Sequence, residues 1–345
     1  MGRRKYTAAV AGLGKRGEVH VKALKGNADR FEIAAVCDLK PDRLELMANR
    51  YGIDRAYDSV DAMLTDVKPD VFVFVTQPDV RLEMIKLAVK HNIKAVAFEK
   101  PMATSVAEAA QITDLCVSGG IKTIVSHQQK YLTSMRRLKQ IVDAGEIGDI
   151  VQMNISTQGW MAHLGTHYMD LALWVNGCSR AKWAAGHVHG RGKLTDNHPS
   201  ADYIMGQVEF ENGVRLFLEN GYLSRSRMSA DKFWFDNRLT VYGETGHVWA
   251  ETNGAWGGCV RGETVGGIGG TWVEQEQQLQ IDYFGEFAEW LDDDGKVHPS
   301  NISIAYHGYE TLEALCLSAL ENRLVRLPVN AAEIPDILER MRAIL

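Results

Sequence analysis

The sequence YTAAVAGLGKRG, residues 6–17, decides the fold of the first part of the chain. It opens as a short unbroken apolar run and ends with Gly12, Gly14 and Gly17, which form the pattern G-x-G-x-x-G. Glycines at this spacing allow a tight turn, a close approach of the backbone to a pyrophosphate group, and close packing of a helix on a strand. The N-terminus of that helix adds N–H groups and the positive end of its dipole. We therefore predict a strand, a dinucleotide-binding turn and a helix.

Further apolar runs follow the first one, and amphipathic stretches separate them. The apolar runs are residues 31–38, 70–76, 94–100 and 122–128, and the amphipathic stretches are residues 17–25, 41–51, 80–91 and 106–119. Unbroken apolar strands that alternate with helices are typical of a parallel sheet covered on both faces. The first part of the chain is therefore predicted to be a doubly wound α/β domain of the Rossmann type.

The second predicted strand ends in an acidic residue, Asp38, which follows Gly17 by 21 residues. A carboxylate at this place binds the ribose 2′-hydroxyl of NAD and repels the 2′-phosphate of NADP. NAD is therefore the expected cofactor. Basic residues nearby in the sequence leave NADP open, and these are Lys15, Arg16, Lys40 and Arg43.

The loop after the third apolar run lies at the carboxyl end of its strand, where sheets of this kind bind ligands. We expect Thr76, Gln77 and Pro78 in this loop to line the ribose and the nicotinamide. The glycine-rich turn and the second strand complete the expected cofactor site, with Gly12, Leu13, Gly14, Lys15, Arg16, Gly17 and Asp38.

Length, charge and cysteine content limit the class of protein. A chain of 345 residues is more than one hydrophobic core usually holds, so two domains are expected. The net charge of −6 argues against a nucleic-acid or anionic membrane partner, and no apolar run is long enough to span a membrane. The five cysteines are scattered, which favours reduced thiols in a cytoplasmic protein over disulfides or a structural zinc site.

The second half of the chain is rich in strand-like segments. Residues 149–157, 203–210 and 214–222 have this pattern, and Glu211-Asn212-Gly213 predicts a hairpin between the last two. The segments 232–236 and 239–243 are also predicted to be strands. Residues 254–272 contain eight glycines, too many for a stable strand or helix, so we expect a loop here, either a mobile lid or an exposed flexible segment.

The stretch MAHLGTHYMDLALW, residues 161–174, carries two histidines four residues apart. On a regular helix His163, His167 and Asp170 share one face, beside an apolar face that would pack in a core. We therefore expect a buried helix that presents these polar groups to a cavity. The spacing H-x-x-x-H could also bind zinc, but the glutamate of H-E-x-x-H is missing, and we predict no metal. A third zinc ligand would come from His187, His189 or His198.

Four motifs together resemble the glucose-fructose oxidoreductase, inositol dehydrogenase and rhizopine-catabolism (Gfo/Idh/MocA) family. They are AVAGLGKRG, VTQPDV, AFEKPMATSVAEA and GTHYMDLALWV, in this order along the chain. The resemblance implies a Rossmann domain at residues 1–124 and an α/β domain at residues 125–345. The second domain would contain a large, mostly antiparallel sheet that faces the nicotinamide and mediates oligomers, so a homodimer or homotetramer is expected.

The resemblance also implies roles for individual residues. Lys100, in Glu99-Lys100-Pro101, would contact the reacting hydroxyl and the nicotinamide ribose, with Glu99 also at the cofactor. His167 would lie near the substrate hydroxyl and Asp170 would help to orient it. His163 stands where the family commonly has an aspartate, so it is a third candidate for proton transfer.

Two further residues are expected on the substrate side, Lys130 and Trp160. A tryptophan suits a sugar ring, which presents C–H groups to aromatic faces, although core packing explains Trp160 equally well. The sequence therefore predicts a cytoplasmic NAD-dependent oxidoreductase that acts on a secondary hydroxyl of a sugar, polyol or glycoside. The alternatives are glycoside cleavage through transient oxidation of the sugar, NADPH-dependent reduction of a keto or imine substrate, and a sensor of cofactor or sugar without turnover.

Overall fold

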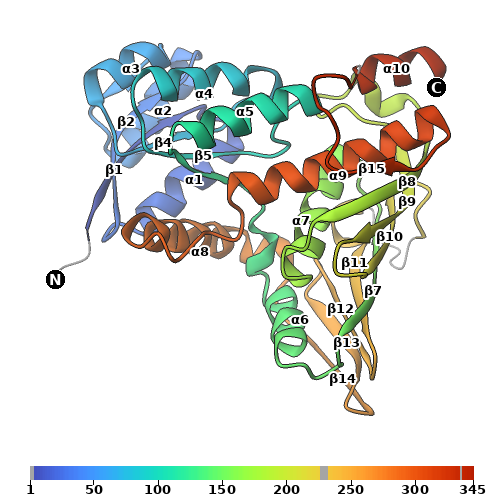
Figure 1. Cartoon of the computed structure of the whole chain (residues 1–345). Coiled ribbons are helices and arrows are strands. Elements are labelled where there is room, and N and C mark those ends of the chain that lie inside the picture. Colours follow the sequence, from blue (N-terminus) through green and yellow to red (C-terminus); the bar gives the residue numbers. More distant parts are fainter. Residues whose placement is uncertain (1–3, 226–231, 335) are drawn as a thin grey trace. The chain divides into compact units, whose positions relative to one another are not determined.

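The computed structural model describes residues 4–225, 232–334 and 336–345 (Figure 1). Internal contacts divide the chain into two units, and each unit draws on segments that are far apart in sequence. The first unit comprises Met1–Ala103, Ala110–Gln128 and Glu276–Ser303, and the second comprises Thr104–Ala109, Gln129–Gln275 and Ile304–Leu345.

The first unit contains a six-stranded parallel sheet with the strand order β3-β2-β1-β4-β5-β6. Its strands are β1 (Tyr6–Ala11), β2 (Phe31–Cys37), β3 (Ala56–Tyr57), β4 (Val71–Phe74), β5 (Ala95–Phe98) and β6 (Lys122–Val125). Five of them match the five predicted apolar runs. The sheet is buried because helices lie on both of its sides, with α3 and α4 on one side and α1 and α8 on the other (Figure 1). The prediction of a doubly wound sheet is confirmed.

Four helices follow the predicted amphipathic stretches closely, and these are α1 (Lys15–Gly26), α2 (Pro41–Tyr51), α4 (Arg81–Lys90) and α5 (Val106–Ser118). The sheet is also accompanied by α3 (Val60–Val67), the short turn η1 (Pro78–Val80) and α8 (Trp272–Asp292). Helix α2 shows why the boundaries were predictable: a proline starts it, and Gly52 ends it in the left-handed conformation with φ 61°. Helix α8 comes from late in the chain, and Asp292 of this helix forms a 2.6 Å ion pair with Arg30.

The second unit contains a nine-stranded sheet with the strand order β14-β13-β12-β11-β7-β10-β9-β8-β15. Among the described strands of this sheet only β10 and β7 pair in parallel, so the prediction of a large, mostly antiparallel sheet is confirmed. The strands are β7 (Ile150–Thr157), β8 (Ala181–His189), β9 (Tyr203–Phe210), β10 (Arg215–Gly221), β11 (Asn237–Gly243), β12 (His247–Glu251), β13 (Ala255–Val260), β14 (Glu263–Ile268) and β15 (Val325–Arg326).

Helices cover one face of this sheet. They include α6 (Thr133–Asp143), α7 (Thr166–Val175) and α9 (Ile302–Glu321). Five shorter elements lie elsewhere in the chain, and these are η2 (Gln128–Tyr131), η3 (Met161–Gly165), η4 (Gly192–Thr195), η5 (Phe233–Phe235) and α10 (Ile337–Ile344). Ser134 of α6 donates a 3.0 Å hydrogen bond to the Glu251 carbonyl of β12, and Gly186 of β8 donates one of 3.0 Å to the Ser318 hydroxyl of α9. No helix in the described part of the chain is long and apolar enough to cross a membrane.

The predicted glycine-rich loop is wrong, because residues 255–268 form the antiparallel hairpin β13–β14. Its glycines make room for tryptophan rings on neighbouring strands. A Cβ on Gly257 would lie 2.9 Å from the Trp249 ring, and a Cβ on Gly267 would lie 2.9 Å from the Trp256 indole nitrogen. Large aromatic side chains over cross-strand glycines recover the packing that glycine itself lacks. The neighbouring prediction of a strand at residues 232–236 is also wrong, since Phe233–Phe235 is a single 3-10 turn.

The prediction of one regular helix that carries both His163 and His167 is wrong as well. Residues Met161–Gly165 form a π-helical turn, in which the Gly165 amide donates a 3.4 Å hydrogen bond to the Trp160 carbonyl five residues earlier. The regular helix α7 starts only at Thr166. A π-turn is wider than an α-turn, so His163 does not continue the α-helical face of His167.

Candidate functional site

The glycine-rich turn of the first unit has the shape that a dinucleotide requires. Gly12 has φ +84°, and a Cβ on it would lie 2.4 Å from the Val75 carbonyl oxygen. A Cβ on Gly17 would lie 2.0 Å from the Gly12 carbonyl oxygen. Gly14 differs, because only the Arg43 side chain comes near its Cβ position, at 3.6 Å. Helix α1 starts directly after Gly14 with no side-chain cap, so its first N–H groups fit a pyrophosphate above this glycine.

The structure brings Asp38 to the same turn. Its carboxylate accepts hydrogen bonds from the backbone N–H groups of Leu13 (2.7 Å) and Lys40 (2.9 Å). The Arg43 guanidinium lies 3.6 Å away. Asp38 is therefore held at the end of β2, where an acidic residue meets the ribose of a bound dinucleotide.

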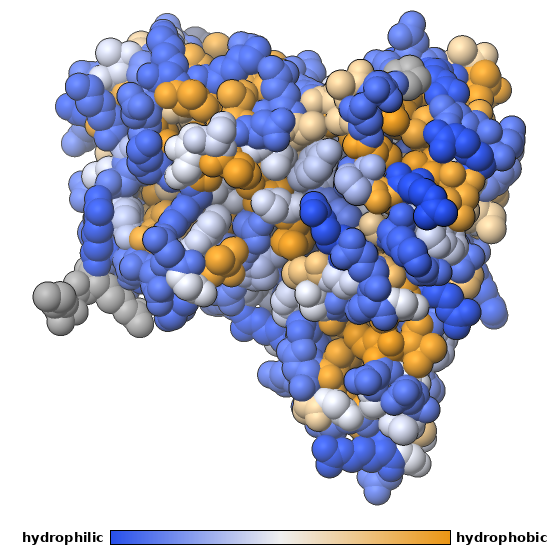
Figure 2. Space-filling view, in the orientation of Figure 1, coloured by the Kyte–Doolittle hydropathy of each residue, from blue (hydrophilic) through white to orange (hydrophobic). Residues whose placement is uncertain are grey.

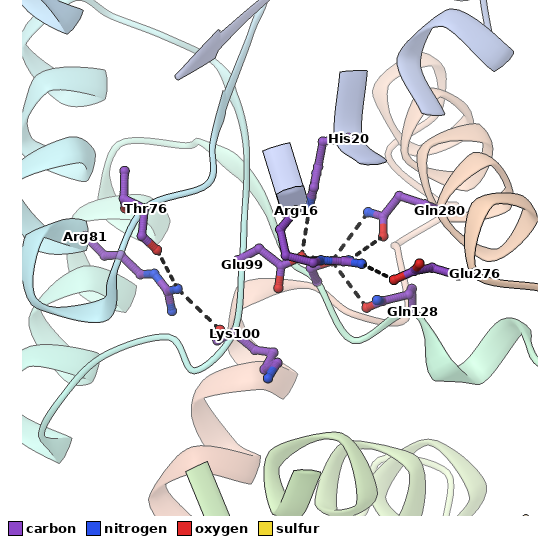
Figure 3. Close-up of polar contacts among 10 residues, drawn as sticks. Arg16, His20, Thr76, Arg81, Glu99, Lys100, Gln128, Glu276 and Gln280 are labelled. Atoms are coloured by element: carbon purple, nitrogen blue, oxygen red, sulfur yellow. Dashed lines mark hydrogen bonds and ion pairs between the residues drawn. The ribbon is translucent and has the colours of Figure 1, made fainter. Parts of the chain in front are cut away.

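Arg16 and Glu99 belong to a partly buried network of ion pairs and hydrogen bonds (Figure 3). Arg16 Nη2 lies 2.9 Å from Glu99 Oε1, and its Nη1 lies 2.7 Å from Glu276 on α8. His20 Nε2 also lies 2.9 Å from Glu99. Burial alone would raise the pKa of Glu99, but the cation of Arg16 and the hydrogen bond from His20 outweigh it and hold the pKa well below its usual range. The side chains of Arg16 and Glu99, both predicted to bind cofactor, thus already bind each other.

Lys100 follows Glu99 at the end of β5, and its side chain stays partly exposed. Desolvation by the surrounding protein lowers the pKa of Lys100 to about 8, and Arg16 and Arg81 act in the same direction while Glu99 opposes them. An amine with such a pKa is neutral far more often than an ordinary lysine near physiological pH, although the charged form still predominates. Lys100 therefore has the protonation behaviour of a general base.

Arg81, which the sequence analysis did not single out, ties the Lys100 turn to the predicted Thr76 loop. Its Nη2 donates to the carbonyl oxygens of Thr76 (2.9 Å) and Lys100 (3.3 Å). Only 1% of Arg81 is exposed. Of the other residues in this loop, Pro78 is buried and Gln77 is exposed. No sequence motif marked Arg81, because its burial and its two carbonyl partners are visible only in the folded structure.

In the second unit Lys130 is not placed to line an open substrate pocket. Its side chain is 1% exposed, and its Nζ lies 2.5 Å from the Asp170 carboxylate, which is 2% exposed. Asp170 lies one turn after His167 on α7, and His167 is itself 4% exposed. The pair therefore anchors the helix that carries His167.

His163 lies in a cluster of aromatic rings, which we call the ring cluster and which also contains Trp160, His198 and Phe233. The His163 ring centroid is 4.7 Å from that of Trp160, 5.3 Å from that of Phe233 and 5.9 Å from that of His198. The Lys193 ammonium lies 4.2 Å above the Trp160 ring. All five side chains are partly exposed. The sequence pointed to Trp160 and His163, but Phe233 and Lys193 come from turns that no motif marked.

The zinc alternative has no geometric support in the described residues. His187 and His189 lie on β8, and only His198 approaches His163. Within residues 4–225, 232–334 and 336–345, no group of three or more histidine, cysteine, aspartate or glutamate side chains could hold a metal ion.

A parallel six-stranded sheet with a glycine-rich turn in one unit, and a nine-stranded mostly antiparallel sheet in the other, define the class of a dinucleotide-binding protein with two structural units. Comparison with family models gives the same result. Residues 6–127 match the NAD-binding Rossmann domain of the oxidoreductase family, and residues 135–249 match the GFO/IDH/MocA C-terminal domain. The chain belongs to the Gfo/Idh/MocA family.

Individual relatives within the family are distant. The scyllo-inositol 2-dehydrogenase (NAD⁺) of Bacillus subtilis is 26% identical over 260 residues, which are 71% of this chain and 73% of the relative. D-apiose dehydrogenase of Rhizobium rhizogenes is 28% identical over 117 residues, so the match spans only 34% of that protein and 34% of this chain. A solved structure of levoglucosan dehydrogenase with NADH and levoglucosan has a TM-score of 0.81 at 14% identity, over 94% of this chain and 100% of that one, and shows the shared fold.

Proposed function

We propose that the protein is an NAD-dependent dehydrogenase that oxidises a secondary hydroxyl of a sugar, polyol or glycoside. The observation that carries this proposal is Lys100, a partly exposed amine whose pKa is lowered to about 8, in the unit that holds the dinucleotide turn. The curated relatives named as inositol, apiose and glucoside dehydrogenases support it.

The chain's own residues would manage the proton of the substrate hydroxyl. When bound, the nicotinamide supplies the acceptor for the hydride that leaves the substrate carbon. Lys100 would take the hydroxyl proton as a neutral amine, because its charged form is disfavoured by desolvation and by two arginines. His167 is proposed as the second proton-transfer group, with His163 as an auxiliary. Lys100 belongs to the first unit, and His163 and His167 belong to the second. The role of each residue is therefore tested by a separate substitution.

NAD is proposed as the working cofactor, because Asp38 sits beside the glycine turn and would repel a 2′-phosphate. Arg43, 3.6 Å from this carboxylate, is the residue through which NADP could also be accepted. Relative binding of the two cofactors to the wild-type protein measures this preference directly.

The ring cluster is proposed to contact the substrate, and it favours a ring-shaped carbohydrate. Aromatic faces pack well against the C–H groups of a sugar ring. The lysine above Trp160 covers one face of the indole, so a sugar would meet the opposite face or the rings of His163 and Phe233. Lys130 is proposed to act indirectly, through the Asp170 ion pair.

The test is a screen of free sugars, polyols and glycosides with NAD, in which NADH absorbance and released sugar are recorded in the same wells. Steady accumulation of NADH with one hydroxylated compound is the expected result. Release of sugar from a glycoside without net NADH would replace the proposal by glycoside cleavage through transient oxidation. Tight binding of NAD with no redox change on any compound would point instead to a sensor.

We also propose that the protein is a cytoplasmic homodimer or homotetramer. Its five cysteines are all free thiols, as expected in a reducing compartment. The sheet face that the helices of the second unit leave uncovered has a depression of about 840 Å³ and exposes Met205, Phe217 and Tyr242. Apolar side chains are visible over this unit in Figure 2. The mass in solution of the wild type and of Phe217→Glu tests whether this face joins subunits.

A further inference from the structure

We propose that Arg16 and Arg81 are positioning residues that hold the Glu99–Lys100 turn from two sides and keep the Lys100 amine in place for proton transfer. Figure 3 shows the arrangement, with Arg16 at the centre of one group of contacts and Arg81 reaching from the Thr76 loop to Lys100. The inference rests on the proposed role of Lys100 as proton acceptor. It concerns two residues that neither the glycine motif nor the Glu-Lys-Pro motif assigns to this task.

Arg81 acts on the backbone of the turn. Its Nη2 donates to the carbonyl oxygens of Thr76 and Lys100, at 2.9 and 3.3 Å, and so ties the loop after β4 to the loop after β5. The side chain is 1% exposed, so these bonds are made in a site that excludes water. A charge-assisted hydrogen bond is about twice as strong as a neutral one, so the guanidinium is well suited to fix this loop.

Arg16 acts on the side chain next to Lys100. Its Nε and Nη2 both donate to Glu99 Oε1, at 3.1 and 2.9 Å, and two residues of α8 hold the same guanidinium from the other side. These are Glu276, at 2.7 Å, and Gln280, at 3.2 Å. Since Arg16 belongs to the first turn of α1, this network joins the pyrophosphate-binding turn to the Lys100 turn in one rigid assembly.

The charges around Lys100 give the arrangement a second effect. Arg16 and Arg81 both lower the pKa of Lys100, while Glu99 raises it. Two further charged or titratable groups belong to the network. Glu276 is paired with Arg16. His20 is buried, which lowers its pKa, so it stays neutral and donates its Nε2–H to Glu99. Removing either arginine should therefore favour the charged amine, and removing the charge of Glu99 should favour the neutral amine.

The experiment measures the protonation of Lys100 without any substrate. The full-length protein is labelled at a series of pH values with trace acetic anhydride, and mass spectrometry gives the labelling midpoint of the Lys100 peptide. The variants are Arg16→Gln, Arg81→Gln, Arg81→Lys and Glu99→Gln. Arg50→Gln is the control, because Arg50 is an exposed arginine whose ion pair with Glu18 lies outside the network. Thermal melts show which variants fold.

We expect a midpoint near 8 for the wild type and for Arg50→Gln. Arg16→Gln and Arg81→Gln should raise it by about one pH unit, and Glu99→Gln should lower it by a similar amount. Arg81→Lys keeps the charge and should keep the midpoint, yet should lower kcat about tenfold with little change in KM, because one ammonium cannot serve both carbonyls in the same way. This variant also covers the case in which Arg81→Gln does not fold.

Unchanged midpoints in the folded Arg16 and Arg81 variants, or an upward shift in Glu99→Gln, would overturn the inference. Opposite shifts from Arg16→Gln and Glu99→Gln cannot come from a general loosening of the fold. Labelling needs no turnover. Shifted midpoints together with an inactive wild type would therefore contradict the proposed dehydrogenase function, and would still establish the electrostatic coupling of Lys100 to its charged neighbours.

Discussion

Two lysines, one in each unit, lie in strongly desolvated surroundings and are held in opposite ways. Desolvation lowers the pKa of Lys100 to about 8, two arginines act in the same direction, and part of the side chain remains exposed. Lys130 is 1% exposed and faces the Asp170 carboxylate at 2.5 Å. We propose that the first lysine exchanges a proton with a bound molecule, whereas the second is held in an ion pair with a buried carboxylate. We therefore expect Lys100 to serve proton transfer and Lys130 to maintain structure through its carboxylate partner.

Replacing Lys100 by Met should have the largest effect on turnover. The substitution keeps the length of the side chain and removes the proton acceptor, so kcat should fall about 10²- to 10⁴-fold. Binding of NAD, followed by quenching of tryptophan fluorescence, and the melting temperature should stay close to the wild type. Full activity of Lys100→Met would show that Lys100 is not the proton acceptor.

Replacing Lys130 by Met should instead destabilise the second unit. Removing one partner of a buried ion pair costs about 3–5 kcal/mol, because the remaining charge stays in a site that excludes water. Denaturant unfolding monitored by circular dichroism measures this loss. The double variant Lys130→Met/Asp170→Leu should recover much of it, since it removes both charges. A stable but inactive Lys130→Met protein would show that the contrast between the two lysines is wrong.

Some elements of the fold were predictable from the sequence and others were not. The five apolar strands, the helices between them and the glycine turn were predictable, because these patterns depend on local periodicity and on a short motif. The two-residue strand β3 and helix α3 (Val60–Val67) were missed, since short elements give weak periodic signals. Helix α8 shows a different limit, because its ion pair with Arg30 joins residues 262 positions apart.

Glycine and histidine patterns misled for physical reasons. The eight glycines at residues 254–270 suggested a loop, yet residues 255–268 form a hairpin in which Gly257 lies against the Trp249 ring and Gly267 against the Trp256 ring. Only the strand register reveals this packing. The single π-turn before α7 cannot be read from hydrophobic spacing. At the candidate site, Lys100 and Asp38 were found from motifs. The partners Arg81 and Phe233 required the folded structure, because no sequence motif contains them.

The pH dependence of turnover distinguishes the roles of Lys100 and Lys130. Since the neutral amine is the active form in oxidation, kcat/KM should rise about tenfold per pH unit at low pH and level off above about 8. Reduction of the corresponding ketone needs the charged amine and should show the opposite trend. In an Asp170→Asn variant that folds, the midpoint should not move, because Lys130 does not supply the proton. A shift there would assign the titration to the second unit.

The smallest expected loss of kcat/KM comes from His163, and comparing it with the loss from His167 shows which histidine moves the proton. His163→Phe keeps an aromatic ring against Trp160 and Phe233, so it preserves packing and removes only the imidazole nitrogens. We expect it to lower kcat/KM less than about tenfold, or ~1.4 kcal/mol. His167→Asn removes the imidazole from α7 and should cost about 10²-fold if His167 moves a proton. Steady-state kinetics of both variants on one substrate gives the order. The reverse order would make His163 the proton-transfer group and would mean that the family carboxylate has been replaced by a working imidazole.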